Sequence, residues 1–379
     1  MKKVTESYLK KENILELYEL ISKMPTCKRN ALLLDIYNDK SKDITPATLL
    51  KNYKNNYEYF GISDFSLREK NWYNGLFLSV LPQHYKDINL SLLNPMGTNS
   101  SITPLSQNLV MSTVKHSEVI SDPTTALTLE GAKLRKELVN NGQKGQNVDL
   151  GTIAQILRMQ PFDKSKGYMQ HFDLFGISSL GRNGKDLDFE VVKLIEHIEI
   201  WLNFIRILQK NNFNLNNISV SISFVPFIEH LIACNLIKKE SITINSLNDD
   251  YDMFAENNIS LPNKINSTNE IDELLVKKYD LEKLKETFKF MELCILKDLK
   301  QKYQEVQFNI ELNRKAGLGY YKNYCFHIYE NTGNSIVQLS DGGVTNWGEL
   351  LLSSKKERNV TSGFGAELVL KLFKERGKL

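Results

Sequence analysis

The sequence predicts an α/β fold in which a mostly antiparallel sheet is flanked by helices, with a helical N-terminal element and a helical insertion. Three patterns lead to this prediction. Polar and apolar residues alternate strictly in residues 217–224, which is typical of a strand. Apolar residues recur at helical spacing in residues 186–210, which predicts a long amphipathic helix. Near the C-terminus, a glycine-bearing turn separates two alternating runs, as in antiparallel hairpins.

The composition is that of a folded protein with balanced charge. The chain has 379 residues, of which 41% are hydrophobic and 25% charged, enough for two domains or for one large domain with an appendage. Its 48 basic and 45 acidic residues are too balanced to indicate a nucleic-acid binder. We find no signal peptide and no apolar run of membrane-spanning length, so we expect no membrane association. The four cysteines are scattered, which favours reduced thiols in a cytoplasmic protein without structural zinc.

The first part of the chain is predicted to be helical. Apolar residues recur at helical spacing from Leu9 to Ile21, and Pro46 is suited to the first position of a helix. Residues 1–62 are therefore interpreted as a helical N-terminal element. Residues 63–225 follow as the first part of a larger core. In order, this part is predicted to hold a helix over 64–81, a strand over 88–95, a short strand ending near Asp122, a helix over 124–138, a long-looped hairpin of 150–160 with 168–180, a helix over 186–210 and a strand over 217–224.

The second half is predicted to complete the core around an insertion. Residues 226–300 are interpreted as the helical insertion, because their helical segments are broken by an Asn- and Ser-rich stretch. Residues 301–379 form the last part of the core. Within it, residues 310–330 are predicted to be two antiparallel strands joined by a turn that contains Gly317 and Gly319. A further strand over 335–339, a Gly-Gly turn at 342–343 and a glycine-led helix over 362–375 follow.

Five short segments carry a resemblance to a known family. They are LEGA at 129–132, ILR at 156–158, AGLGYY at 316–321, GG at 342–343 and GFG at 363–365. Their order and spacing resemble the catalytic core of class II aminoacyl-tRNA synthetases, in particular the histidyl-tRNA synthetase branch. The likeness spans roughly residues 65–375. It implies an antiparallel synthetase-type sheet, in which AGLGYY takes the place of the branch's histidine signature.

The sequence departs from the family where the family handles ATP. Gln160 stands in place of the motif 2 glutamate, and Leu368 stands in place of the motif 3 arginine. The signature arginine falls on Ala316, although Arg314 is close by, and the signature aspartate falls on Gly319. Adenylation needs cationic groups on the phosphates, because negative charge builds up there in the transition state. We therefore expect that ordinary tRNA charging is lost, and we expect no anticodon-binding domain.

The resemblance implies two groups of site residues. Those expected to contact a bound amino acid are Glu130, Tyr320 and Tyr321, and those expected to contact a nucleotide are Arg158, Gln160 and Arg314. Plainer explanations exist for several of them. Glu130 would be favourable in the first turns of a helix on electrostatic grounds alone, and either tyrosine could simply pack. Arg158 lies in an apolar run, where a charged residue has to be paired or face a cavity. No histidine has a second ligand at metal spacing, so no metal site is expected.

The leading functional prediction is a histidyl-tRNA synthetase-like paralogue that has lost tRNA charging. It would act as an amino-acid-binding regulatory or accessory subunit, in the manner of the regulatory subunit of ATP phosphoribosyltransferase. It would form a homodimer and bind a partner enzyme, and tRNA is not expected as a partner. One alternative is a ligase that uses ATP and magnesium to form an acyl-adenylate for transfer to an amine, a carrier or a protein. Another is an interaction protein with a vacant pocket, whose N-terminal helices bind a partner.

Overall fold

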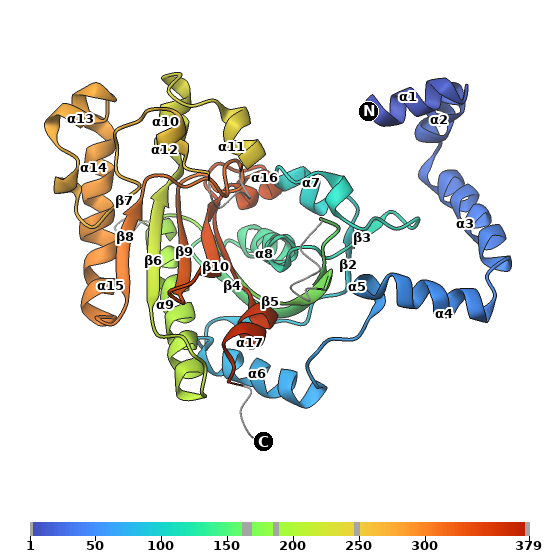
Figure 1. The fold of residues 1–379 in the computed structure, drawn as a ribbon, viewed down its shortest axis with the longest axis horizontal. Helices are drawn as coiled ribbons and strands as arrows, with labels where there is room; N and C mark the ends of the chain where they lie inside the picture. The colour runs from blue at the N-terminus through green and yellow to red at the C-terminus, as the bar shows by residue number, and fades with distance from the viewer. Residues whose placement is uncertain (1–2, 161–168, 185–188, 246–250, 376–379) are drawn as a thin grey trace.

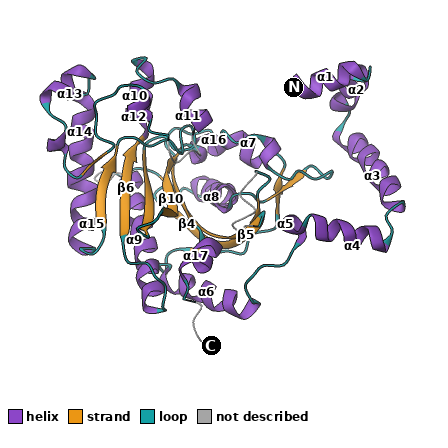
Figure 2. Cartoon of the chain, in the orientation of Figure 1, coloured by secondary structure: helices purple, strands orange, loops and turns teal. Residues whose placement is uncertain are grey.

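A nine-stranded sheet forms the centre of the protein, with helices on both of its faces (Figures 1 and 2). The computed structural model describes residues 3–160, 169–184, 189–245 and 251–375. No helix within these ranges combines the length and the apolar character needed to cross a membrane. Strands β2 (Leu93–Pro95) and β3 (Ser117–Val119) pair separately. The large sheet has the strand order β1 (Lys86–Asp87), β4 (Val148–Leu157), β5 (His171–Gly181), β11 (Arg358–Phe364), β10 (Ile336–Thr345), β9 (Tyr324–Asn331), β6 (Ile218–Phe224), β8 (Gln307–Glu311) and β7 (Lys264–Ile265).

The α/β fold with flanking helices is confirmed, but the large sheet is mixed where the sequence predicted a mostly antiparallel one. Strand β1 runs parallel to β4, and β6 runs parallel to β8, whereas the other neighbours are antiparallel. Parallel neighbours need a long crossover connection, which usually contains a helix. The crossover from β1 to β4 contains α7 (Thr98–Ile102) and α8 (Pro123–Asn140). The crossover from β6 to β8 contains the helices from α10 (Val225–Ala233) to α15 (Lys297–Lys302).

The hairpin predicted over residues 310–330 is wrong in its pairing. Strands β8 and β9 both hydrogen-bond to β6, which lies between them. The backbone of every strand has two hydrogen-bonding edges, and β6 uses one for β8 and the other for β9, in place of the local pairing that the sequence suggested. Gly342 and Gly343 lie inside β10, and Gly363 lies inside β11, so these glycines form neither the predicted turn nor the start of a helix.

Helices cover the two faces of the sheet unequally. Adjacent residues of β5 mark the two faces, because Ser178 bonds to Thr128 of α8 (Oγ–Oγ1 3.0 Å) and Ser179 bonds to His197 of α9 (Oγ–Nε2 3.1 Å). On the first face, α8 packs against β4, β5 and β11. On the second face, α9 (Phe189–Lys210) packs against β5, β9, β10 and β11, and α6 (Leu67–Val80) packs on α9. The remaining body helices are α11 (Lys239–Asn245), α12 (Met253–Glu256), α13 (Glu273–Lys278), α14 (Glu282–Phe290), α16 (Trp347–Leu352) and α17 (Ala366–Phe373).

Five further helices form an arm that extends from the body (Figure 1). None of the helices α2 to α5 contains a buried residue. The arm joins the body near β5, where the backbone nitrogen of Gln170 donates to the carbonyl oxygen of Glu58 at 2.9 Å. The arm consists of α1 (Lys3–Lys11), α2 (Leu15–Lys23), α3 (Thr26–Lys42), α4 (Pro46–Asn55) and α5 (Tyr57–Phe60).

Stacked aromatic rings hold α6 and α9 against the sheet. The ring of Phe77 is fully buried, with its centroid 4.5 Å from that of Phe175 and 5.5 Å from that of Trp201. Phe77→Ala should lower the free energy of unfolding by about 3–5 kcal/mol, because the substitution removes these ring contacts and leaves a cavity in the core. The matched change Phe60→Ala, on the exposed arm, should cost less than about 0.5 kcal/mol. Urea unfolding monitored by circular dichroism measures both, and equal effects would contradict this description of the core.

Candidate functional site

One face of the sheet is lined by polar side chains across four neighbouring strands. In β9, Phe326 and Ile328 enter the hydrophobic core, so His327 points to the opposite face. The register places Asp341 of β10 beside His327, Ser221 of β6 beside His327 on its other side, and Asn309 of β8 beside Ser221. This row, Asp341–His327–Ser221–Asn309, is called the polar face below. It lies on the same side of the sheet as α8, which covers the neighbouring strands β4, β5 and β11.

The same side of the sheet is identified through α8 itself. Asn359 of β11 accepts from Thr345 of β10 (Oγ1–Oδ1 2.7 Å) and from Thr128 of α8 (Oγ1–Oδ1 3.4 Å). Residues alternate along a strand, so Gly343 and Asp341 follow Thr345 on this side. The polar face therefore continues the surface on which α8 lies.

A buried ion pair stands at the edge of the polar face. The guanidinium of Arg314 donates from Nη2 to Oδ1 of Asp341 at 2.9 Å and from Nε to the carbonyl oxygen of Ala316 at 2.8 Å. Arg314 is buried, whereas the Asp341 side chain is 32% exposed. Burial alone would raise the pKa of Asp341, but the charges of Arg314 and His327 outweigh burial and lower this pKa to about 2. Asp341 is therefore a carboxylate throughout the neutral range.

His327 links this pair to a second carboxylate. Its Nε2 lies 3.5 Å from Oδ1 of Asp341, and its Nδ1 lies 3.7 Å from Oε2 of Glu311 and 2.6 Å from the hydroxyl of Tyr329. Burial opposes ionisation of Glu311, but the hydrogen bond and charge of His327 lower the pKa of Glu311. Lys264 lies 3.9 Å from Glu311 and donates to Ser221 at 3.2 Å. Each carboxylate of this cluster thus has a cation beside it.

Buried polar atoms without a hydrogen-bond partner gather on and around the polar face. A buried polar group that lacks a partner costs about 1–3 kcal/mol, so such groups indicate a place for water or a ligand. Within the described part of the chain, these atoms include Oγ of Ser223, Oγ1 of Thr361, Oδ1 of Asn309 and Nη1 of Arg314. By register, Thr361 lies beside Gly343, Gly343 beside Cys325, and Cys325 beside Ser223.

The loop between β8 and β9 carries the tyrosines that the sequence singled out. Gly317 and Gly319 have φ values of 86° and 80°, a region that favours glycine. A Cβ on Gly317 would lie 2.7 Å from the ring of Tyr321, which packs under the guanidinium of Arg314 (5.4 Å to the ring centroid). Burial raises the pKa values of Tyr320 and Tyr321, so both stay protonated. The two rings lie 5.0 Å apart between centroids, and the loop places both tyrosines at one end of the polar face.

Tyr320 meets a carboxylate that the sequence reasoning missed. Its hydroxyl donates to Oδ2 of Asp122 at 2.8 Å, and Asp122 caps α8 by accepting from the backbone nitrogen of Thr124 at 2.8 Å. Glu130 instead lies in the middle of α8, partly exposed, and pairs with Lys133 at 3.0 Å. The Asp-Pro-Thr sequence before the apolar run was the available signal for Asp122, because it is typical of a helix N-cap.

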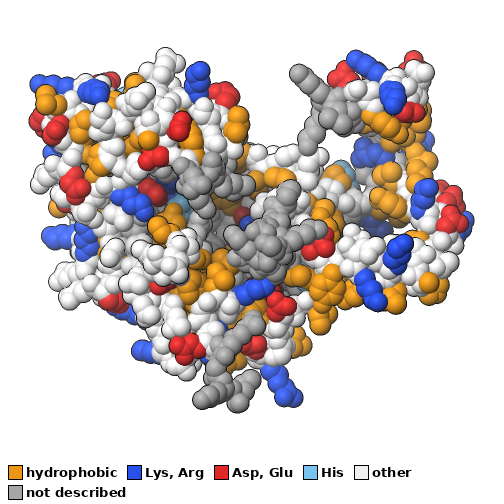
Figure 3. Space-filling view, viewed as in Figure 1, with side chains coloured by type: hydrophobic (Ala, Val, Ile, Leu, Met, Phe, Trp, Pro, Cys, Tyr) orange, Lys and Arg blue, Asp and Glu red, His pale blue; other side chains and the backbone are white. Residues whose placement is uncertain are grey.

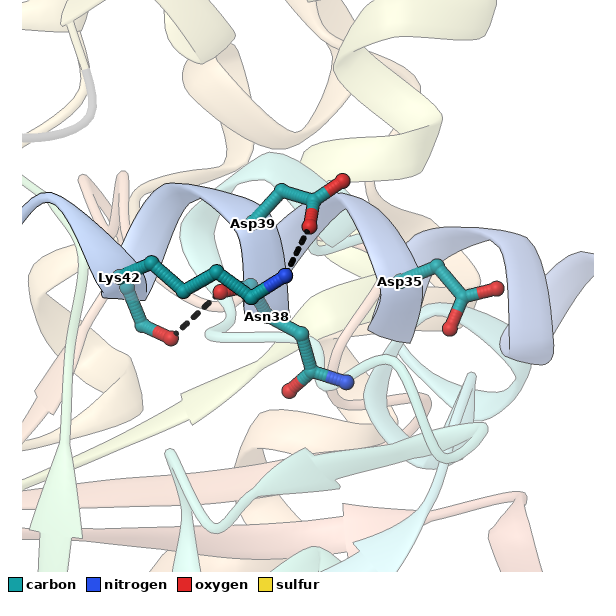
Figure 4. Close-up of a pocket in the computed structure, with 5 residues that line it drawn as sticks. Asp35, Asn38, Asp39 and Lys42 are labelled. Atoms are coloured by element: carbon teal, nitrogen blue, oxygen red, sulfur yellow. Dashed lines mark hydrogen bonds and ion pairs between the residues drawn. The ribbon is translucent and has the colours of Figure 1, made fainter.

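Within the described part of the chain, no hydrogen bond or ion pair links the three expected nucleotide-binding residues to one another. Arg158 follows the end of β4, where its Nε donates to the carbonyl oxygen of Ser121 at 3.2 Å and its guanidinium lies 5.5 Å from the ring centroid of Phe172. Arg314 is committed to Asp341 on the polar face. No hydrogen bond joins the side chain of Gln160 to a described residue. A hollow lined by Asp35, Asn38, Asp39, Ser41 and Lys42 lies on α3, away from all these groups, and its own members bond to one another there (Figure 4).

Comparison with solved structures shows which known fold the chain shares. No protein-family model matches the chain, and no curated protein sequence matches it. An ATP phosphoribosyltransferase regulatory subunit/histidyl-tRNA synthetase from Bacillus halodurans superposes with a TM-score of 0.58 at 14% identity, over 82% of this chain and 81% of that one. A histidine–tRNA ligase subunit from Alicyclobacillus acidocaldarius gives 0.55 at 13% identity, over 82% and 95%. A histidyl-tRNA synthetase from Nostoc gives 0.52 at 14% identity, over 80% and 72%.

These likenesses establish the fold. The chain has the architecture of histidyl-tRNA synthetase-like proteins, and the resemblance predicted from the short motifs is confirmed at that level.

The ion pair predicts a particular dependence of stability on pH. Because the folded-state pKa of Asp341 is lowered from 3.8 to about 2, the stability it contributes is present above pH about 4 and is lost as the pH falls toward 2. The difference in unfolding free energy between wild type and Asp341→Asn should therefore be largest near neutral pH and shrink below pH about 4. Urea unfolding at a series of pH values measures it, and a difference that is constant with pH would contradict the ionised pair.

Proposed function

We propose that this chain is a histidyl-tRNA synthetase-like paralogue that does not charge tRNA and that binds an amino acid as a regulatory or accessory subunit of an enzyme. The observation that carries the proposal is the polar face. It combines partly buried charges of both signs with buried polar atoms that lack partners. A zwitterion with several donors and acceptors suits such a surface, because it can satisfy these groups without adding net charge.

The same charges argue against ATP as the ligand of the polar face. A triphosphate needs several cations that are free to contact it. Arg314 already binds Asp341, and Lys264 already donates to Ser221 beside Glu311. The carboxylates of Asp341 and Glu311 would repel phosphate oxygens. An adenylate-forming ligase remains the alternative, and it would have to use Arg158, whose side chain donates to the carbonyl oxygen of Ser121.

The arm supports the part of the proposal that concerns a partner. Large apolar side chains recur along it and stay exposed (Figure 3). A monomeric protein rarely exposes so many neighbouring apolar side chains, and such surfaces mark interaction sites. Among these side chains, those at least half exposed include Tyr8, Leu17, Leu20, Tyr37, Leu49, Leu50 and Phe60. We propose that the arm docks the partner enzyme, and that the body pairs with a second copy of the chain.

A thermal-shift panel tests the ligand. One or more amino acids should raise the melting temperature of the purified chain without ATP, because a ligand that binds only the folded state stabilises it by mass action. At 100 times the dissociation constant, this stabilisation is about 2.7 kcal/mol. A shift that requires ATP and magnesium, and that disappears in Arg158→Ala, would instead support the ligase. A panel without any shift would favour the interaction protein.

A charge substitution on the arm tests the partner. Leu49→Lys with Leu50→Lys should abolish co-purification of the partner enzyme while leaving the amino-acid shift unchanged, because both side chains are exposed and far from the polar face. Leu274→Lys, on exposed α13, is the matched control and should retain the partner. The proposal expects the co-purified protein to be an enzyme. Its catalytic rate should change when this chain is added together with the amino acid that raises the melting temperature. Retention of that enzyme by the arm variant would refute docking on the arm.

A further inference from the structure

We propose that Asp341 is the receptor for a positively charged amino group of the ligand, so that the ligand of the polar face has to be a free amine. This inference rests on the proposed function, since it concerns the same face. It assigns the amino-group contact to a residue of β10 and not to Glu130, the acidic residue that the family resemblance placed among the contacts of the amino acid.

Asp341 has one oxygen that the protein leaves available. Its Oδ1 accepts from Arg314 at 2.9 Å and lies 3.5 Å from Nε2 of His327. Its Oδ2 accepts no hydrogen bond from any residue that the structure describes, and the side chain is 32% exposed. A partly exposed carboxylate with a fixed orientation and one open oxygen is a suitable acceptor for an ammonium group.

Space beside this oxygen is provided by a glycine. Gly363 lies next to Asp341 in the register of β10 and β11. A Cβ built on Gly363 would meet only the carbonyl oxygen of Phe175, at 3.5 Å, so no described side chain fills this position. An ammonium group needs such room, because it carries three N–H donors that must each find an acceptor.

A second acceptor is buried nearby. Thr361 is 1% exposed and lies two residues before Gly363 on β11, facing the same side of the sheet. Its Oγ1 has no hydrogen-bond partner among the described residues. An ammonium group held by Asp341 could donate to this hydroxyl as well, which would satisfy a buried group that is otherwise left unpaired.

The other carboxylates near the tyrosine loop are either already hydrogen-bonded or less accessible than Asp341. Asp122 accepts from Thr124 and Tyr320. Glu311 lies beside His327 and Lys264 with its side chain only 14% exposed, and its Oε2, although it lacks a hydrogen-bond partner among the described residues, is buried away from solvent. Glu130 pairs with Lys133 at the surface of α8. Among the described carboxylates around this loop, Asp341 is the one that combines partial exposure with an open oxygen.

The test compares free amines with their blocked counterparts on the unaltered full-length protein. Isothermal titration calorimetry is run with the amino acids that shift the melting temperature, with the corresponding decarboxylated amines, and with the N-acetyl amino acids. Blocking the amino group should weaken binding on the order of 10- to 100-fold, as expected for the loss of one charge-assisted hydrogen bond. This comparison needs no variant and does not depend on the folding of one.

Variants then assign the effect to the residue. Asp341→Asn should lose on the order of 10- to 100-fold in affinity for the free amine. Thr361→Val, which leaves the Arg314–Asp341 pair intact, should lose about 5-fold. Asp298→Asn, on the exposed surface of α15, is the matched control and should bind as the wild type does.

The outcomes separate this inference from the proposed function. Equal binding of N-acetyl amino acids, or unchanged affinity in a folded Asp341→Asn, would overturn the inference and leave the amino-acid subunit standing. Binding of decarboxylated amines without any amino acid would overturn the proposed function and support the inference. If no amine-bearing compound binds, the inference and the proposed function are both refuted.

Discussion

The site depends on the buried pair of Arg314 and Asp341. An unpaired guanidinium in the interior would be strongly destabilising, because its desolvation would go uncompensated. Asp341 supplies the opposite charge, and the carbonyl oxygen of Ala316 takes a second donor of the same guanidinium. The pair fixes the start of the loop that carries Tyr320 and Tyr321 to strand β10. Without it, the loop would have no charged anchor on the sheet, and Tyr321 would lose the guanidinium that packs on its ring.

Glycines make this arrangement sterically feasible. A Cβ on Gly343 would lie 2.5 Å from Cβ of Cys325 and 2.8 Å from the ring of Tyr321, so no larger residue fits beneath that ring. Gly317, in the loop, is also required, because a Cβ there would lie 2.7 Å from the same ring. Gly363 differs from both, because the space above it is open. Close packing against Tyr321 and open space beside Asp341 thus occur on the neighbouring strands β10 and β11.

The sequence was sufficient for the features that depend on local patterns. The alternation in β6 and the apolar spacing in α9 predicted both elements, and the order of short motifs predicted the fold that the structural comparison confirms. Pairing between distant strands was not predictable in the same way. The runs around Gly317 look like a local hairpin, and only the tertiary fold shows that β6 lies between them. The placement of Glu130 was not predictable for a related reason, since a glutamate-glycine motif says nothing about which side of α8 faces the sheet, and its contact with an amino acid stays a prediction.

Under the proposed function, the ligand site has to be connected to the surface that the partner contacts. Contiguous hydrogen bonds join the tyrosine loop to the base of the arm. Tyr320 binds Asp122 at the start of α8, and the carbonyl oxygen of the preceding residue, Ser121, accepts from the side chain of Arg158. The backbone nitrogen of Arg158 donates to Gln170, whose own backbone nitrogen donates to Glu58 at the base of the arm. In this arrangement, Arg158 is a structural junction between the tyrosine loop and the arm. Arg158 therefore has a structural role in the fold that does not require a bound phosphate.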